Sequence, residues 1–306
     1  MAGVLTASVV LALVLPGRGG HGDVTREVRL QGFAEPGDDR FTDSTDPRGG
    51  ASVPPAARDA SPGAVDGPAA HRGTADGLYG GTRNVPACEV ERQISRLGAT
   101  PAKNKAFAVA AGVEPVAVPR YLRSLTPLRL VKDAWVTDHG YRGGEAYPYQ
   151  AVLQAGTAVL VDRLAVPRVR CACGNPLSEP LSEPDGKGRY RTTGHRWPGF
   201  SLARTVRVKP AEKPVDTFVV VDLADPGRRI ARPAGGTGHR YDRTAPSPAA
   251  PTTGTATTTR PATASGPVTG TGGLTGEARA HARDGPGTTR ARRARQAPDP
   301  GGPVGG

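Results

Sequence analysis

Apolar positions in the second quarter of the chain recur at the spacing of helices. Over residues 88–97 the apolar residues lie three or four positions apart, which places them on one helix face. Thr100 followed by Pro101 is typical of a helix start, so residues 103–111 are predicted to form a second helix. A third short helix is expected at residues 121–125.

From residue 128 onward the period of the pattern changes to two, which is typical of strands. The predicted strands cover residues 128–131, 134–137, 157–161, 166–171, 205–208 and 217–221, and a separate short strand covers residues 27–31. The strand positions predicted to be buried are Val159, Leu160, Val161, Val219 and Val220. Because the helices come first and the strands follow, the sequence predicts an α+β fold. It would have a small N-terminal helical part packed on an antiparallel sheet, with a disordered linker and tail.

Glycine and proline dominate much of the remaining chain. The 306 residues include 42 glycines and 31 prolines, and only 37% of all residues are hydrophobic. Segments of this kind bury too little apolar surface to offset the entropy lost on ordering. The expected organisation is an apolar anchor or signal remnant at 1–22, a short strand and disordered linker at 23–77, a folded domain at 78–237, and a disordered Thr/Pro/Gly/Arg-rich tail at 238–306.

Residues 4–15 form an apolar run at the start of the chain. The run is shorter than the roughly 20 residues of a spanning helix, and no basic segment of the signal-peptide type precedes it. We interpret it as a signal remnant or as the outer end of a longer transmembrane helix. The sequence therefore predicts a membrane partner through this segment, and a location at the extracytoplasmic face of the cell membrane or in the secreted fraction.

The net charge of +12 fits an anionic partner, such as a cell-wall polymer. Arginine-rich chains with much alanine, glycine and proline are also typical of high-GC genomes. The sequence has no recognition-helix pattern, and aromatic and basic residues do not alternate as they do in single-strand binders. We therefore expect no nucleic-acid partner.

The three cysteines are Cys88, Cys171 and Cys173. In an exported chain, a disulfide from Cys88 to either Cys171 or Cys173 is the simplest interpretation, because oxidising compartments favour disulfides. Two residues that lie two positions apart on a strand face the same side, so the sequence does not choose between these partners. The alternative is a structural zinc site in which His139 completes a Cys₃His set.

A catalytic interpretation would combine Cys171 or Cys173, as the nucleophile, with His139 and Asp138. No spacing in the sequence brings these residues together, and Asp-His-Gly before a glycine-rich segment is typical of a turn. Phosphate-binding loops and dinucleotide fingerprints are absent from the sequence. We therefore assign no catalytic residue, metal or cofactor, and keep Asp138 and His139 as weak site candidates.

Five segments of the chain resemble an actinobacterial extracytoplasmic family, domain of unknown function 6777. These segments are residues 78–84, 121–127, 136–141, 151–162 and 167–177. The resemblance covers about residues 78–237, and residues 27–46 resemble what precedes the domain in relatives. It implies an extracytoplasmic location behind a transmembrane segment, and it carries no catalytic residues. One departure is Ala165, which stands in a turn where relatives tend to have glycine.

Together these patterns favour a non-catalytic extracytoplasmic module that binds or senses a ligand, a cell-wall polymer or a protein. One alternative is a cell-envelope enzyme that uses the Cys/His/Asp set. The other is an intracellular module stabilised by zinc.

Overall fold

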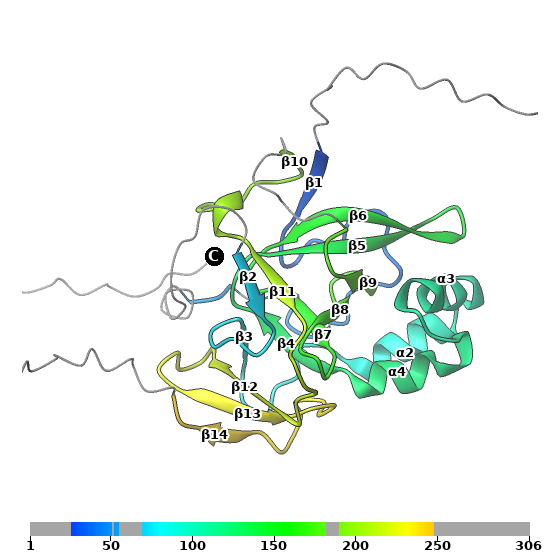
Figure 1. Cartoon of the computed structure of the whole chain (residues 1–306). Coiled ribbons are helices and arrows are strands. Elements are labelled where there is room, and N and C mark those ends of the chain that lie inside the picture. Colours follow the sequence, from blue (N-terminus) through cyan, green and yellow to red (C-terminus); the bar gives the residue numbers. More distant parts are fainter. Residues whose placement is uncertain (1–25, 51, 55–68, 182–189, 248–306) are drawn as a thin grey trace, which may run out of the picture. The chain divides into compact units, whose positions relative to one another are not determined.

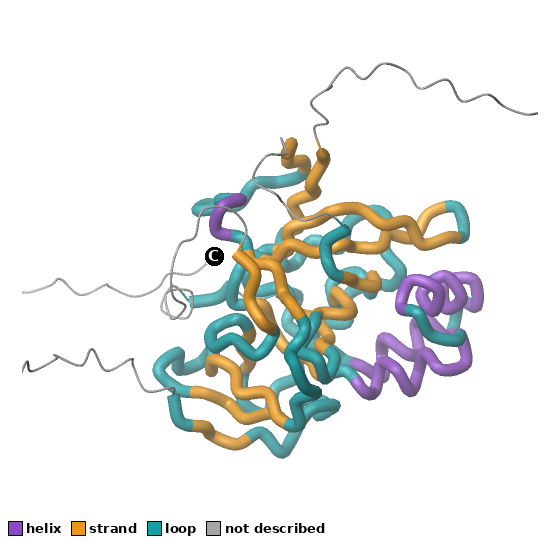
Figure 2. Tube along the Cα trace, in the orientation of Figure 1, coloured by secondary structure: helices purple, strands orange, loops and turns teal. Residues whose placement is uncertain are grey.

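Fourteen strands, linked by hydrogen bonds into one mixed sheet, dominate the part of the chain that the structure describes (Figure 1, Figure 2). The structure is a computed structural model, and it describes residues 26–50, 52–54, 69–181 and 190–247. These ranges all fall within one structural unit.

The strands follow an order in the sheet that differs from their order in the sequence. Their bounds are β1 Arg26–Gln31, β2 Ala69–Arg72, β3 Tyr79–Gly81, β4 Thr126–Leu130, β5 Ala134–Arg142, β6 Glu145–Leu153, β7 Ala158–Val161, β8 Pro167–Arg170, β9 Asn175–Ser178, β10 Tyr190–Thr193, β11 Val206–Lys209, β12 Thr217–Asp222, β13 Arg229–Pro233 and β14 Arg243–Ala245. The sheet order is β10-β1-β6-β5-β9-β8-β7-β4-β3-β12-β13-β14, and β11 pairs with β2 and β5. The hairpin predicted at residues 157–171 is confirmed as the antiparallel pair β7–β8.

The predicted fold class, a small N-terminal helical part packed on an antiparallel sheet, is wrong. The fold is mostly a mixed sheet with few helices, and five of the described strand pairs are parallel. Parallel pairing joins segments that are far apart in sequence, so no hairpin turn signals it locally. The longest missed strand is β6, whose alternation is interrupted by Pro148.

The three predicted helices are confirmed as α2 Val90–Gly98, α3 Pro101–Ala111 and α4 Val118–Ser124. Two short 3-10 helices, η1 Pro115–Ala117 and η2 Leu202–Arg204, complete the described helical segments. Figure 1 shows α2, α3 and α4 gathered at one end of the unit, and α3 contacts β6 and β9. The helices bury Leu97, Phe107 and Leu122 in a cluster that also contains Leu160 of β7.

Most of the predicted core residues are buried, with one exception on β12. Val159, Leu160, Val161 and Val220 are at most 2% exposed, whereas Val219 is 50% exposed. Neighbouring residues of a strand point to opposite faces, and Val219 lies on the open face of β12. The prediction for Val219 is therefore wrong, because an unbroken apolar run does not reveal that one face of its strand is open.

Buried arginines of the sheet bind aspartates in the segments that connect its strands. Arg129 of β4 binds Asp46 through two hydrogen bonds of 2.9 and 2.7 Å. On β13, Arg229 pairs with Asp76 and Arg232 pairs with Asp242, in both cases through two nitrogens. We call these three the clamp pairs: Asp46–Arg129, Asp76–Arg229 and Asp242–Arg232. All three aspartates lie outside the expected 78–237 domain.

Ordered structure is therefore present on both sides of residues 78–237. Strands β1, β2 and β14 lie outside those limits, and the loop from residue 32 to residue 50 buries Phe41, Thr45 and Asp46. The predicted anchor at 1–22, linker residues 55–68 and the tail beyond residue 247 lie outside the described residues.

The predicted membrane partner is not supported. In the described ranges, the structure has no helix with the length and apolar character to cross a bilayer. The apolar run at residues 4–15 would extend about 18 Å as a helix, against a hydrocarbon core of about 30 Å. The run itself lies outside the described residues.

Candidate functional site

A surface cavity of about 270 Å³ lies where β1 meets the loop that follows it. Its lining residues come from parts of the chain that are distant in sequence, and most of their side chains are polar. The polar side chains include Arg29, Gln31, Tyr149, Arg170, Asn175 and Thr193. Three carboxylates, Glu35, Asp38 and Asp39, complete the polar wall, and Leu30 and Pro36 are the apolar side chains in the described lining. We call this cavity the β1 pocket.

Parallel strand pairing assembles the β1 pocket. Strand β1 lies between β6 and β10, and pairs with both in parallel. In this register Gln31 lies opposite Leu153 of β6, and its amide nitrogen donates a 2.9 Å hydrogen bond to the hydroxyl of Tyr149, four residues earlier on the same strand. Because β10 ends opposite β1, Thr193 also reaches the pocket.

Arg170 forms part of the pocket wall although its side chain is fully buried. One terminal nitrogen donates to the carbonyls of Gly32, at 2.8 Å, and Glu35. The other lies 3.7 Å from the sulfur of Cys173. Its third nitrogen, Nε, has no acceptor among the described residues. The guanidinium therefore holds the loop after β1 in place and keeps one N–H unused.

Asp138 lies behind the pocket wall, fully buried on β5. Its Oδ1 accepts a 2.9 Å hydrogen bond from Asn175, whereas its Oδ2 lacks a donor in the described part of the chain. Burial raises the pKa of Asp138, against the opposing effects of Arg170, Asn175 and Gln31. The Gln31 side chain interacts with this carboxyl, yet Oε1 of Gln31 is also without a donor. A proton on Asp138, or a turned Gln31 amide, would supply the missing donor.

Cys173 lies beside the same buried groups. Burial raises the pKa of its thiol to about 12, although Arg170 acts in the opposite direction. The thiol is therefore protonated at neutral pH, and a protonated thiol is a poor nucleophile.

His139 does not join Asp138 and Cys173. It follows Asp138 on β5, so its side chain leaves the other face of the strand, where Nδ1 lies 3.2 Å from the carbonyl of Pro176. The structure thus brings Asp138 and Cys173 to one buried cluster and leaves His139 outside it.

The predicted disulfide is confirmed, and its partner is Cys171. Cys88 and Cys171 are bonded, with their Cα atoms 5.9 Å apart, and Cys173 is free and buried. The bond joins the segment before α2 to the end of β8. Because the disulfide occupies two of the four proposed zinc ligands, the Cys₃His set is not assembled.

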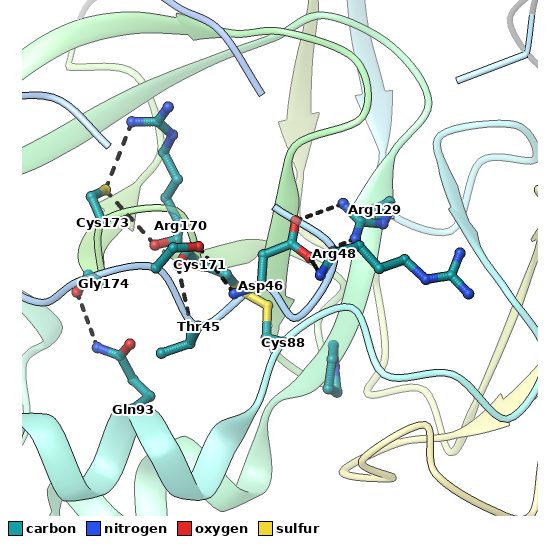
Figure 3. Close-up of a disulfide and its surroundings, with 12 residues drawn as sticks. Thr45, Asp46, Arg48, Cys88, Gln93, Arg129, Arg170, Cys171, Cys173 and Gly174 are labelled. Carbon is teal, nitrogen blue, oxygen red and sulfur yellow. Dashed lines mark hydrogen bonds and ion pairs between the residues drawn. A yellow bond between two sulfur atoms is a disulfide. The ribbon is translucent and has the colours of Figure 1, made fainter. Parts of the chain in front are cut away.

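Cys171 and Cys173 do not share a strand face as expected, because β8 ends at Arg170 and a turn follows. The Gly174 amide donates to the Arg170 carbonyl at 2.8 Å, and Gly174 has a φ of +68°. Figure 3 shows Cys173 with the Arg170 guanidinium on one side of this turn and the disulfide on the other. The turn therefore directs Cys171 toward the helices and Cys173 toward Arg170.

Most residues of the β1 pocket carry no signal that sequence reasoning recognised. Gln31 and Arg170 lie in predicted strands, and Arg170 is in the hairpin partner of a strongly apolar strand, but neither was a candidate. An arginine within an apolar strand requires a buried partner, and this was the signal that could have identified Arg170. Tyr149 and Asn175 lie in segments for which no strand was predicted.

The fold and the pocket define a mixed-sheet domain with a small polar cavity at its surface. Residues 69–235, more than half of the chain, match the family described as Domain of unknown function (DUF6777), and the chain belongs to this family. The predicted family is confirmed, while its actinobacterial and extracytoplasmic character stays a prediction. Neither a curated protein nor a solved structure matches the chain. The match begins after β1, so Gln31 and the loop at 35–39 lie outside it.

Proposed function

We propose that the protein is a non-catalytic, extracytoplasmic binding module that holds a small polar ligand in the β1 pocket. One observation carries this proposal. Arg170, a residue that lines a cavity open to the surface, is fully buried and keeps its Nε–H without an acceptor among the described residues. Leaving such a group without a partner costs about 1–3 kcal/mol, and a ligand that pairs with it recovers part of that cost.

The chemistry of the cluster favours binding over catalysis. A nucleophilic cysteine needs an adjacent base or a lowered pKa, and the pKa of Cys173 is raised to about 12. His139 lies on the opposite face of β5. A binding role requires only that the polar groups are held in place, as Arg170 is by the carbonyls of Gly32 and Glu35.

The disulfide between Cys88 and Cys171 supports the extracytoplasmic part of the proposal. Disulfides persist in oxidising compartments and are rare in the cytosol. The test is to alkylate intact cells that produce the full chain, and then to count free thiols by mass spectrometry. Cells should yield a chain with one free thiol in the exported fraction. Three free thiols in a cytosolic fraction would overturn this location.

The pocket itself is tested by ligand-observed NMR with the full chain and a library of small polar compounds. Binding of these compounds should be lost in Gln31→Leu, which removes the amide at similar side-chain volume. Binding should be retained in Asn104→Ala, which removes an exposed amide on α3. Bound compounds should be recovered chemically unchanged. A library with no Gln31-dependent binder, or a compound that is turned over, contradicts the proposal.

A further inference from the structure

We infer that the ligand of the β1 pocket is a neutral polyhydroxylated compound, a single sugar ring, either free or at the end of a polymer. This inference rests on the proposed function and specifies its ligand class.

The unused groups at the pocket include both a donor and acceptors. Nε–H of Arg170 has no acceptor among the described residues, and the exposed carboxylates of Glu35 and Asp38 are acceptors in the lining. Oε1 of Gln31 is directed to the buried Asp138 carboxyl instead. The Tyr149 hydroxyl accepts from Gln31, so its own proton is available to donate. A hydroxyl group donates and accepts at once, so neighbouring hydroxyls on one ring match such a mixed set.

The geometry of Arg170 disfavours an anion. Carboxylates and phosphates are bound most strongly when two guanidinium nitrogens donate side by side. In Arg170 one terminal nitrogen is bonded to backbone carbonyls and the other faces the sulfur of Cys173. Both terminal nitrogens therefore already have partners, and Nε cannot form a two-pronged contact by itself.

Charges at the rim also disfavour an anion. Glu35 and Asp38 are exposed carboxylates that line the pocket. Arg29 is the second cation in the lining, but it is engaged with Asp39 at 3.7 Å and lies over the Tyr149 ring at 4.2 Å. A phosphate would therefore approach two carboxylates before it met a free cation, whereas a neutral sugar would not be repelled.

The size of the pocket suits one ring. Its volume of about 270 Å³ is below the roughly 300–1,000 Å³ of pockets that enclose drug-sized ligands. Because Arg29 covers Tyr149, this tyrosine contributes its hydroxyl rather than an open stacking face. Recognition therefore depends on hydrogen bonds, and a longer glycan would extend from the pocket into solvent.

The test is calorimetric titration of the full chain with glucose, galactose and N-acetylglucosamine, and in parallel with inorganic phosphate and citrate. At least one sugar should bind, at least about tenfold more tightly than either anion, which is a difference near 1.4 kcal/mol. Tyr149→Phe, which removes one hydroxyl, and Gln31→Leu should each weaken sugar binding by about tenfold. Asn104→Ala should leave it unchanged.

Soluble oligomers of the sugar that binds distinguish the two sources. Equal or tighter binding of the oligomer supports a polymer end, and binding of the monosaccharide alone supports a free sugar; both support the inferred class. Tighter binding of phosphate or citrate, lost in Gln31→Leu, overturns the sugar class and leaves the binding function intact. The class is also overturned if no sugar binds while other library compounds bind in a Gln31-dependent way. If neither sugars nor library compounds bind, the proposed function fails as well.

Discussion

The clamp pairs and the β1 pocket bury the same kinds of charged side chain in opposite ways. In the Asp242–Arg232 pair both side chains are fully buried. Nε and one terminal nitrogen of Arg232 each donate a hydrogen bond to a different carboxylate oxygen of Asp242. At the pocket, Arg170 is as deeply buried, but among the described residues its bonds go to backbone carbonyls and one sulfur. Asp138 acts on it through charge and not through contact.

This difference distinguishes buried charges that stabilise the fold from buried charges that are available to a ligand. A buried arginine that meets a carboxylate in both hydrogen bonds has little capacity left for a ligand. A buried arginine and a buried carboxyl that each retain an unpaired atom are costly, and such groups concentrate at functional sites. The clamp pairs therefore fix the segments around the sheet, and the pocket retains unused bonding capacity.

The largest expected effect is at a clamp pair. Asp242→Ala leaves Arg232 buried without its partner, and should lower the free energy of unfolding by about 3–5 kcal/mol, enough to unfold a marginal domain. Chemical denaturation monitored by circular dichroism measures this change.

Two further variants control this experiment. Asp216→Ala removes the partner of Arg163 from an exposed pair and should have little effect. The double change Arg232→Met with Asp242→Leu should recover most of the lost stability, because it leaves no unpaired charge. Equal losses for Asp242→Ala and Asp216→Ala would erase the contrast between clamp pairs and surface pairs.

The second-largest effect on stability is expected from reduction of the disulfide. The bond links residues 83 positions apart, and its loss should lower the free energy of unfolding by about 2–5 kcal/mol. The same bond anchors the turn that carries Arg170 and Asn175 into the pocket, so ligand binding should weaken too. Thermal denaturation of oxidised and reduced protein measures the first effect. Cys173→Ala is the matched control, since it retains the disulfide; a reduced protein as stable as this variant would contradict the prediction.

A smaller effect of opposite sign is expected at Asp138. Burial raises the pKa of this carboxyl, so folding favours the protonated form. The stability that this proton contributes is complete below the unfolded pKa of about 3.9, and is lost as the pH rises through the folded pKa. Asp138→Asn keeps the shape without the charge, and its amide supplies a donor toward Gln31. The variant should be more stable than the wild type at neutral pH by about 1–3 kcal/mol.

The pH dependence of stability tests the direction of the pKa shift of Asp138. The stability difference between Asp138→Asn and the wild type should be small near pH 4, about the unfolded pKa, and should grow as the pH rises. Thermal denaturation over this range measures it, with Asp43→Asn, an exposed carboxyl, as control. A wild type that gains stability over the variant with rising pH would show that Asp138 is charged and well paired, as in a clamp pair.

The smallest effect concerns reactivity alone. The Cys173 thiol is buried and its pKa is raised to about 12, so alkylation at neutral pH should be at least about a hundredfold slower in the folded than in the unfolded chain. Mass spectrometry of timed iodoacetamide reactions measures both rates, with no reductant present so that one thiol is counted. Rapid modification of the folded protein would mean that the buried cluster around Cys173 opens to solvent.

Local signals predicted local structure in this chain. The β7–β8 hairpin and helices α2, α3 and α4 were predicted because their residues interact with near neighbours. The bond from Cys88 was predicted from residue type, but not its choice of Cys171, because Cys171 and Cys173 were expected on one strand face and a turn at residues 171–174 separates them.

The mixed sheet and the pocket could not be predicted in the same way. Strand β1 was expected, but its parallel neighbours β6 and β10 lie more than 100 residues further along the chain. The partners of the clamp arginines come from segments whose composition suggested a linker and a tail. Asp138 was a candidate for its place next to His139, whereas its actual neighbours Gln31 and Asn175 are set by the sheet order.

The bridge between Cys88 and Cys171 also makes the chain a closed covalent ring over that interval. The ring contains all three described α-helices and strands β4 to β8, including the exposed turn at Gly143 and Gly144 between β5 and β6. A protease that cuts this turn would produce two fragments that stay joined by the sulfur bond. Both fragments would retain their places in the sheet, since the nine paired positions of β5 and β6 flank the cut. The molecule is thus suited to internal nicking or insertion at this turn without separation of its parts.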